Sequence, residues 1–240
     1  GRYGIRLHNP FLSPSLSTDL WITDPYPPDE PREIARYESG WGRFARELAV
    51  KEDTAYLVFD GGGLEVVDIS DPSAPREVSQ FETMSHPRDI AVVDGTAYIA
   101  VDGYQDCNGL LILDVGDATH PGSGDDEFFR FCGFGDPRSI AVSGSYAYIG
   151  AESALYVIDI SDPTAPYEVA RVATPANATT IQGSYAYVAA AEHGLRIFDI
   201  QVPSAPQLVG AVAFPETFSG PDWAQAITVA GRRAYVGASR

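Results

Sequence analysis

The segment that decides the fold class is PRSIAVSGSYAYIGA, residues 137–151, followed by ALYVIDISDPTAPYEVA, residues 154–170. Its apolar residues predict four short strands, at 140–142, 147–151, 155–160 and 168–172. Gly144 supplies the positive φ that a tight hairpin between the first two strands needs. Pro163 fixes φ in the turn before the fourth strand, and the Asp162 side chain can accept hydrogen bonds from backbone N–H groups two residues on.

The same unit recurs along the whole chain. Ala-Tyr pairs open similar apolar runs at residues 55–56, 97–98, 147–148, 186–187 and 234–235. A second apolar run ends in aspartate at Asp24, Asp68, Asp114, Asp159 and Asp199. A period of roughly forty residues made of short strands is typical of propeller blades. We therefore predict an all-β, five-bladed β-propeller whose blades are four-stranded and antiparallel.

The repeat also predicts the domain boundaries. Four blades fall at about 46–82, 88–133, 138–173 and 177–213. Residues 226–240 supply the first two strands of a fifth blade, and residues 19–37 supply its last two. Because an open ring leaves strand edges unpaired, we expect these halves to pair and close one domain over 19–240.

Residues 1–18 lie outside the repeat and form an N-terminal arm. The arm either adds to the sheet edge of a neighbouring molecule or is a tail that packs along its own blade or stays loose.

Three segments carry a resemblance to a known family: VVDISDPSAP at 66–75, VIDISDPTAP at 157–166 and IFDIQVPSAP at 197–206. They resemble the repeats of LVIVD-repeat β-propellers, and the resemblance extends over about residues 19–240. Members of that family are mostly secreted or surface-attached proteins of bacteria and archaea, often without a defined activity. The resemblance therefore implies an extracellular or cell-surface protein without catalytic activity, while the motif itself carries no chemistry.

The charge of the chain limits its partners. With 33 acidic and 16 basic residues the net charge is −17. A field of this sign repels nucleic acid and anionic lipid, so neither is expected as a partner. No run of 18 apolar residues occurs, which argues against membrane insertion.

One position of the repeat, ten residues before each motif tyrosine, is expected to ring the mouth of the central channel. It holds Arg46, Arg88, Arg138, Asn177 and Gln225. Three guanidinium groups at one mouth could bind a carboxylate, sulfate, phosphate or glycan. Alternatively, each arginine pairs with a neighbouring carboxylate such as Glu47 or Asp89 and ties blades together.

The sequence shows no catalytic set. The first strands are apolar at 48–50, 90–92 and 140–142, and the carboxylate pair needed for glycoside hydrolysis is not evident there. The four histidines have no metal-ligand spacing, and no helix follows the glycines at 61–63 that could make a phosphate site. We expect neither enzyme activity nor a cofactor; a hydrolase would need carboxylates that converge from the loops.

Two cysteines, Cys107 and Cys132, fall on the same rim of the second blade. They form a disulfide, as is usual in secreted proteins, or remain two free thiols. Residues 102–109 have some oxygen-ligand character but lack the spacing of a calcium loop, which favours a solvated acidic loop over bound calcium. Asn177 opens a glycosylation sequon that can be used or unused.

Aromatic residues gather at 41–44, 128–131 and 214–223. They either fill the core between blades or anchor an interface. Our leading hypothesis is a secreted or surface structural propeller that acts in protein–protein interaction. Its partner is itself, as a homo-oligomer or filament, or another surface protein. The alternative is a glycan- or anion-binding propeller that uses the arginine-lined mouth.

Overall fold

The computed structural model describes residues 4–8, 19–24, 32–39, 44–82, 86–104, 107–119, 121, 127–214, 216–217, 220–221 and 223–239. All regular elements in this part are β-strands, and none of its residues forms a helix that could cross a membrane. The chain divides into two compact units, Gly1–Ala97 with Leu113–Glu127, and Tyr98–Ile112 with Phe128–Arg240.

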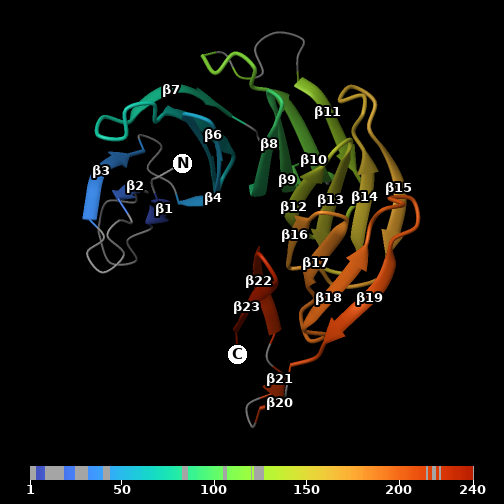
Figure 1. Ribbon diagram of the computed structural model, residues 1–240. Coiled ribbons are helices and arrows are strands. Elements are labelled where there is room, and N and C mark those ends of the chain that lie inside the picture. Colours follow the sequence, from blue (N-terminus) through green and yellow to red (C-terminus); the bar gives the residue numbers. More distant parts are fainter. Residues whose placement is uncertain are drawn as a thin grey trace. The chain divides into compact units, whose positions relative to one another are not determined.

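The first unit contains two complete sheets (Figure 1). One has the strand order β1-β2-β3 and comprises Gly4–His8, Asp19–Asp24 and Arg32–Glu38. The other has the order β4-β5-β6-β7 and comprises Ala45–Lys51, Thr54–Phe59, Gly63–Asp68 and Arg76–Phe81. The next sheet along the chain, in the order β11-β10-β9-β8, comprises His86–Val93 (β8), Thr96–Tyr104 (β9), Cys107–Asp114 (β10) and Glu127–Cys132 (β11).

The second unit contains two further four-stranded sheets. The sheet β12-β13-β14-β15 comprises Pro137–Ser143, Tyr146–Ala151, Leu155–Asp159 and Tyr167–Val172. The sheet β16-β17-β18-β19 comprises Ala178–Gln182, Tyr185–Ala189, Leu195–Asp199 and Gln207–Val212. A short pair, β20 (Glu216–Thr217) and β21 (Gly220–Pro221), precedes the two-stranded sheet of β22 (Trp223–Ala230) and β23 (Arg233–Ser239). The prediction of four-stranded antiparallel sheets is confirmed for four repeats; the number of blades and the closure of the last one stay predictions.

Apolar side chains between neighbouring sheets form the core. In the first unit Leu20 and Ile22 of β2 are buried against Leu57, Phe59 and Val67. In the second unit Tyr148 and Val157 are buried with Val188 and Phe198 of the next sheet. The middle strands β5, β6, β13 and β14 are buried on both faces, whereas the fourth strands β7 and β15 are partly exposed. This gradient is expected where sheets stack face to face with one edge outward.

The hairpins explain the glycines of the repeat. Gly144, Gly183 and Gly231 each hold the first position of a two-residue turn and have φ of 56°, 61° and 59°. Glu52 holds the same place between β4 and β5, with a φ of 52°. A side chain in this left-handed region is strained, because its Cβ approaches the backbone.

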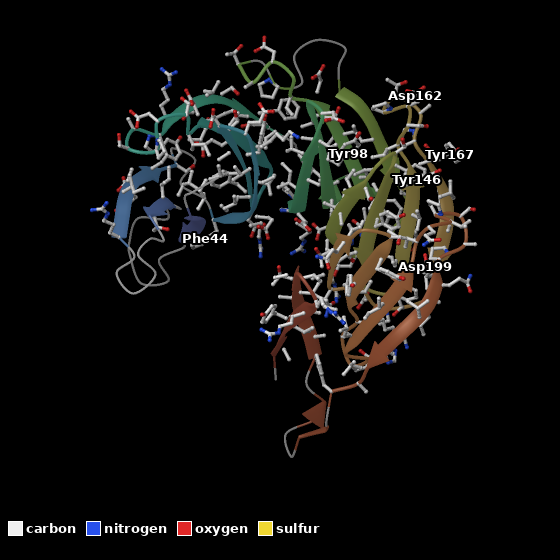
Figure 2. The ribbon with its side chains drawn as sticks, viewed as in Figure 1. Phe44, Tyr98, Tyr146, Asp162, Tyr167 and Asp199 are labelled. Carbon is white, nitrogen blue, oxygen red and sulfur yellow. The ribbon has the colours of Figure 1, made fainter. Side chains whose placement is uncertain are left out.

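The aspartate that ends the third strand is structural. Asp68, Asp114, Asp159 and Asp199 each accept a hydrogen bond from the N–H two residues on, at 2.7–2.9 Å. Asp162 does the same for Thr164 at 2.9 Å, as predicted (Figure 2 labels Asp162 and Asp199). Hydrogen bonds from the side chains of Ser161 and Thr164, together with these backbone bonds, hold the pKa of Asp159 and Asp162 below the ordinary aspartate value. The repeated aspartate therefore shapes a turn and is not left free for chemistry.

Candidate functional site

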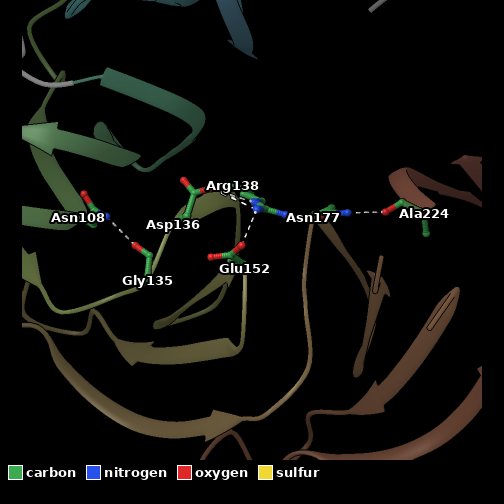
Figure 3. A network of polar contacts seen from close by, with 7 residues as sticks. All are labelled: Asn108, Gly135, Asp136, Arg138, Glu152, Asn177 and Ala224. Atoms are coloured by element: carbon green, nitrogen blue, oxygen red, sulfur yellow. Dashed lines mark hydrogen bonds and ion pairs between the residues drawn. The ribbon is translucent and has the colours of Figure 1, made fainter. Parts of the chain in front are cut away.

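The best-defined polar network surrounds Arg138 in the second unit (Figure 3). Its Nη1 donates to Asn177 Oδ1 at 2.5 Å, and its Nη2 lies 3.2 Å from Asp136 Oδ2 and 3.7 Å from Glu152 Oε1. Asn177 Nδ2 in turn donates to the carbonyl oxygen of Ala224 at 2.7 Å. The network ties the first strands of successive repeats together, which is the structural alternative considered for this arginine.

Arg46 has an equivalent arrangement in the first unit. Its Nη2 lies 2.5 Å from Asp60 Oδ2, and His86 Nδ1 lies 3.6 Å from the other oxygen of the same carboxylate. Arg46, His86 and Arg88 all contribute to holding the pKa of Asp60 below its ordinary value, against the opposing effect of burial. An anion arriving at Arg46 would compete with this carboxylate.

Arg46 and Arg88 both lower the pKa of Asp60, and Arg138 donates a hydrogen bond to Asn177. Gln225 lies in β22 and is exposed. Whether the five residues line one mouth stays a prediction. Asn177 is buried and its Nδ2 is already hydrogen-bonded, so a glycan on this nitrogen would have to break the contact to Ala224.

The remaining sequence predictions fall partly outside the described residues. Cys107 lies in β10 and Cys132 at the end of β11, which are neighbouring strands, and their disulfide stays a prediction. Residues 105–106, which belong to the segment considered for calcium, lie outside the described part. No group of three or more metal-ligating side chains occurs among the residues that are described.

The aromatic segments have different surroundings. Phe44 is exposed (Figure 2). Phe131 packs against Phe134, with ring centroids 5.3 Å apart, and Phe134 packs against Tyr156 at 4.6 Å. Phe131 therefore belongs to a packed aromatic cluster, while residues 41–43 and 218–219 lie outside the described residues.

The sequence did not predict that Glu65 is a buried acid. Glu65 of β6 is fully buried, and its Oε1 accepts from the Tyr37 hydroxyl at 2.7 Å and from Gln80 Nε2 at 3.2 Å. Glu77 shares both donors, at 3.4 Å and 3.0 Å. Burial raises the pKa of Glu65, and burial together with the Glu65 hydrogen bond raises that of Tyr37. Glu65 Oε2 has no hydrogen-bond partner among the described residues.

A signal for Glu65 was present in the sequence. The third strands align as Gly/Ala-Leu-x-Val/Ile, and the variable position holds Leu111, Tyr156 and Arg196 in the later repeats. A carboxyl group at this position departs from the apolar strand, but only the structure shows that it is buried beneath Tyr37.

A cavity of about 350 Å³ also lies in the first unit. Its wall includes the hairpin residues Lys51, Glu52 and Asp94, with the side chain of Tyr56 beneath them. Burial and the Glu52 carboxylate raise the pKa of the Tyr56 hydroxyl.

An uncovered apolar surface lies at the end of the repeat array. Val169 and Val172 of β15 pack against the neighbouring sheet, but their equivalents in β19, Val209 and Val212, are 55% and 54% exposed. We call Val209 and Val212 the open face. The face is open because only the first two strands of a repeat, β22 and β23, follow β19 in the described residues.

The motif tyrosines of β13 and β23 differ in exposure in the same way. Tyr148 is 1% exposed, whereas Tyr235 of β23 is 52% exposed. A Cβ added to Gly150 would lie 2.5 Å from the carbonyl oxygen of Ala176, but at the equivalent Gly237 the nearest atom is Ala226 Cβ at 3.4 Å. Both comparisons indicate that, within the second unit, no neighbouring sheet covers β23 as one covers β13.

Comparison with known proteins agrees with this repeat analysis. A family model described as LVIVD repeat matches residues 42–83, 86–123, 134–174 and 176–213, more than half of the chain. No curated protein matches the sequence.

Three solved structures share the fold. A computationally designed protein, Ika8, is 13% identical with a TM-score of 0.65, and the match covers 99% of this chain and 65% of that protein. A protein from Lactobacillus plantarum is 16% identical with a TM-score of 0.71, covering 94% and 70% of the two chains. A functionally unknown protein from Desulfotomaculum acetoxidans is 12% identical with a TM-score of 0.55, covering 92% and 83%.

These structural likenesses concern the fold alone, and the chain spans about two thirds of the length of the first two proteins. The family match, in contrast, falls on four repeats, the second of them up to residue 123, and includes each of their third-strand aspartates. The chain belongs to the LVIVD-repeat family.

Proposed function

We propose that this protein is a noncatalytic interaction module: a β-propeller, with five blades, that assembles with copies of itself. The open face carries the proposal. Val209 and Val212 occupy positions that are covered in the preceding repeat, at Val169 and Val172, and Tyr235 exposes a side chain that is buried at the equivalent Tyr148.

The free energy available at this surface is substantial. Complete burial of a valine or a similar apolar side chain is worth about 1.5–3 kcal/mol relative to exposure. Val209, Val212 and Tyr235 are each about half exposed, so covering all three would contribute a few kcal/mol before the costs of association. Such a surface favours a stable contact with a complementary sheet.

The first test is the size of the purified protein over a range of concentrations. Light scattering coupled to size exclusion should show oligomers, and negative-stain microscopy should show rings joined into larger particles. Val209→Glu with Val212→Glu should shift the protein towards the monomer. Val202→Glu is the matched control, because Val202 is 58% exposed but lies in a turn outside the open face. A strictly monomeric wild type at high concentration would overturn the proposal.

The proposal includes an extracellular or cell-surface location. Support comes from the two cysteines in neighbouring strands, since disulfides persist in oxidising compartments. Fractionation of the native host tests this location directly: recovery in the cytosolic fraction with reduced thiols would contradict it.

Binding of an anion or glycan at the arginine positions remains the second candidate. The carboxylates beside Arg46 and Arg138 already compete for both guanidinium groups, which is why we rank it below self-assembly. An array of glycans and anions would reveal a ligand, and Arg138→Ala should abolish its binding without unfolding the chain.

A further inference from the structure

The three-stranded sheet of the first unit carries the register of the repeat's third and fourth strands. In complete repeats the pairing of these strands shifts at one step, between Val66 and Val67, between Val157 and Ile158, and between Ile197 and Phe198. The pairing of β2 with β3 shifts between Ile22 and Thr23, at the same distance from Asp24. The bulge thus identifies β2 as a third strand and β3 as a fourth strand, since bulges mark fixed positions within a family of sheets.

β1 takes the place of a second strand on this sheet. In the complete repeat Ala147 pairs with Ile158 and the motif Tyr148 pairs with Val157. On β2 the equivalent partners are Gly4, opposite Thr23, and Ile5, opposite Ile22. Ile5 therefore stands where the repeat has its tyrosine, although β1 lies outside the repeated sequence. The arm is found along its own sheet, one of the placements that the sequence left open.

β23 has the register of a second strand, but no third strand pairs with it among the described residues. The pairing of β22 with β23 shifts between Ala224 and Ala226, and the first and second strands of two complete repeats shift at the same step, between Pro137 and Ser139 and between Ala45 and Glu47. Among the described residues β23 pairs with β22 alone. In a complete repeat, the residue equivalent to Ala234 pairs with the residue equivalent to Thr23.

We infer that β1 is a stand-in strand, and that β23 of a second copy replaces it on β2 when the protein assembles. This inference rests on the proposed function and names its contact. The incoming half-blade would complete β2 and β3 with β22 and β23, and would place β2 and β3 of the accepting copy over the open face of the donor. Added strands bind chiefly through main-chain hydrogen bonds, which the shared register allows.

The two half-blades are complementary to each other and not to themselves. One offers the third and fourth strands, the other the first and second, so the contact between copies is heterologous. Heterologous contacts propagate into filaments or close into rings. Before assembly, β1 shields the edge of β2, which would otherwise be a template for uncontrolled pairing.

Two pairs of cysteines that share position 23 test the exchange. Gly4→Cys with Thr23→Cys joins residues that are partners in β1 and β2 and locks the stand-in strand in place. Ala234→Cys with Thr23→Cys joins the residues that would become partners after exchange. Both variants are oxidised, then compared with the wild type on nonreducing gels and by light scattering, with added reductant as the control.

The locked variant should lose the oligomers and regain them on reduction. The exchange variant should give a ladder of covalently linked copies that collapses to one band on reduction. A single band from the exchange variant, linked within one chain, would overturn the inference and show that the chain closes on itself. Oligomers that persist in the locked variant would also overturn it, while leaving self-assembly through another surface intact. Ile5→Pro provides a further check, because it weakens β1 and should promote assembly.

Discussion

The buried carboxyl of Glu65 makes a quantitative prediction about pH. Burial raises the pKa of Glu65 above the ordinary glutamate value of 4.5. Its contribution to stability is therefore fully present below pH 4.5 and is lost as the pH rises through the raised pKa of the folded state. The pKa values of Asp68 and Asp159 are instead lowered in the folded protein. Their contribution to stability is therefore present above the ordinary aspartate pKa and is lost as the pH falls.

Glu65→Gln removes the charge and keeps an oxygen that can accept from Tyr37 and Gln80. At high pH the wild type holds a buried charge with one oxygen unpartnered among the described residues and Glu77 nearby. An unsatisfied buried polar group costs about 1–3 kcal/mol, and more when charged. The variant should therefore gain about 1–3 kcal/mol of unfolding free energy over the wild type as the pH rises above 4.5, by at most about 1.4 kcal/mol for each pH unit.

Urea unfolding of both proteins at several pH values, followed by fluorescence, measures this difference. Comparing the two proteins at each pH cancels the contributions of the aspartates they share. Glu77→Gln is the control, because Glu77 shares the donors but is exposed, so its effect should be smaller. A difference between Glu65→Gln and wild type that stays constant with pH, or shrinks as pH rises, would refute the reasoning.

Three smaller predictions concern the repeat itself. Glu52→Gly should raise the unfolding free energy by about 1 kcal/mol, because it relieves a side chain at positive φ; an unchanged urea midpoint would contradict this. Asp159→Ala should lower it by about 1 kcal/mol through loss of the bond from the Ser161 N–H, and should also weaken the acid sensitivity of unfolding. Cys132→Ser should lower it by about 3 kcal/mol if the predicted disulfide closes the segment after Cys107; two titratable thiols in the native wild type would exclude the bridge.

Much of the fold follows from the sequence, because its signals are local. Strands predicted at 147–151 and 168–172 are found at Tyr146–Ala151 and Tyr167–Val172. The turn roles of Gly144 and Asp162 follow from backbone geometry within two residues. Each of these features repeats several times, so the pattern corrects for variation within any single copy.

The candidate site was harder to predict because it depends on contacts between distant segments. The arginines at positions 46 and 138 were identified, but their pairing with Asp60 and Asp136 depends on loops that vary between repeats. The burial of Glu65 depends on Tyr37, which comes from a different sheet. β1 has no repeat signature, so only strand pairing reveals that it occupies a second-strand position.

The bulge that recurs between third and fourth strands has an evolutionary consequence. Because three complete repeats are kinked at the same step, one repeat can be duplicated or deleted as a whole without disturbing the alignment of its neighbours. Loss of a single residue, in contrast, would turn every later side chain of that strand to the wrong side. Duplication or deletion of a gene segment can therefore lengthen or shorten such an array in whole units while each unit keeps its own register.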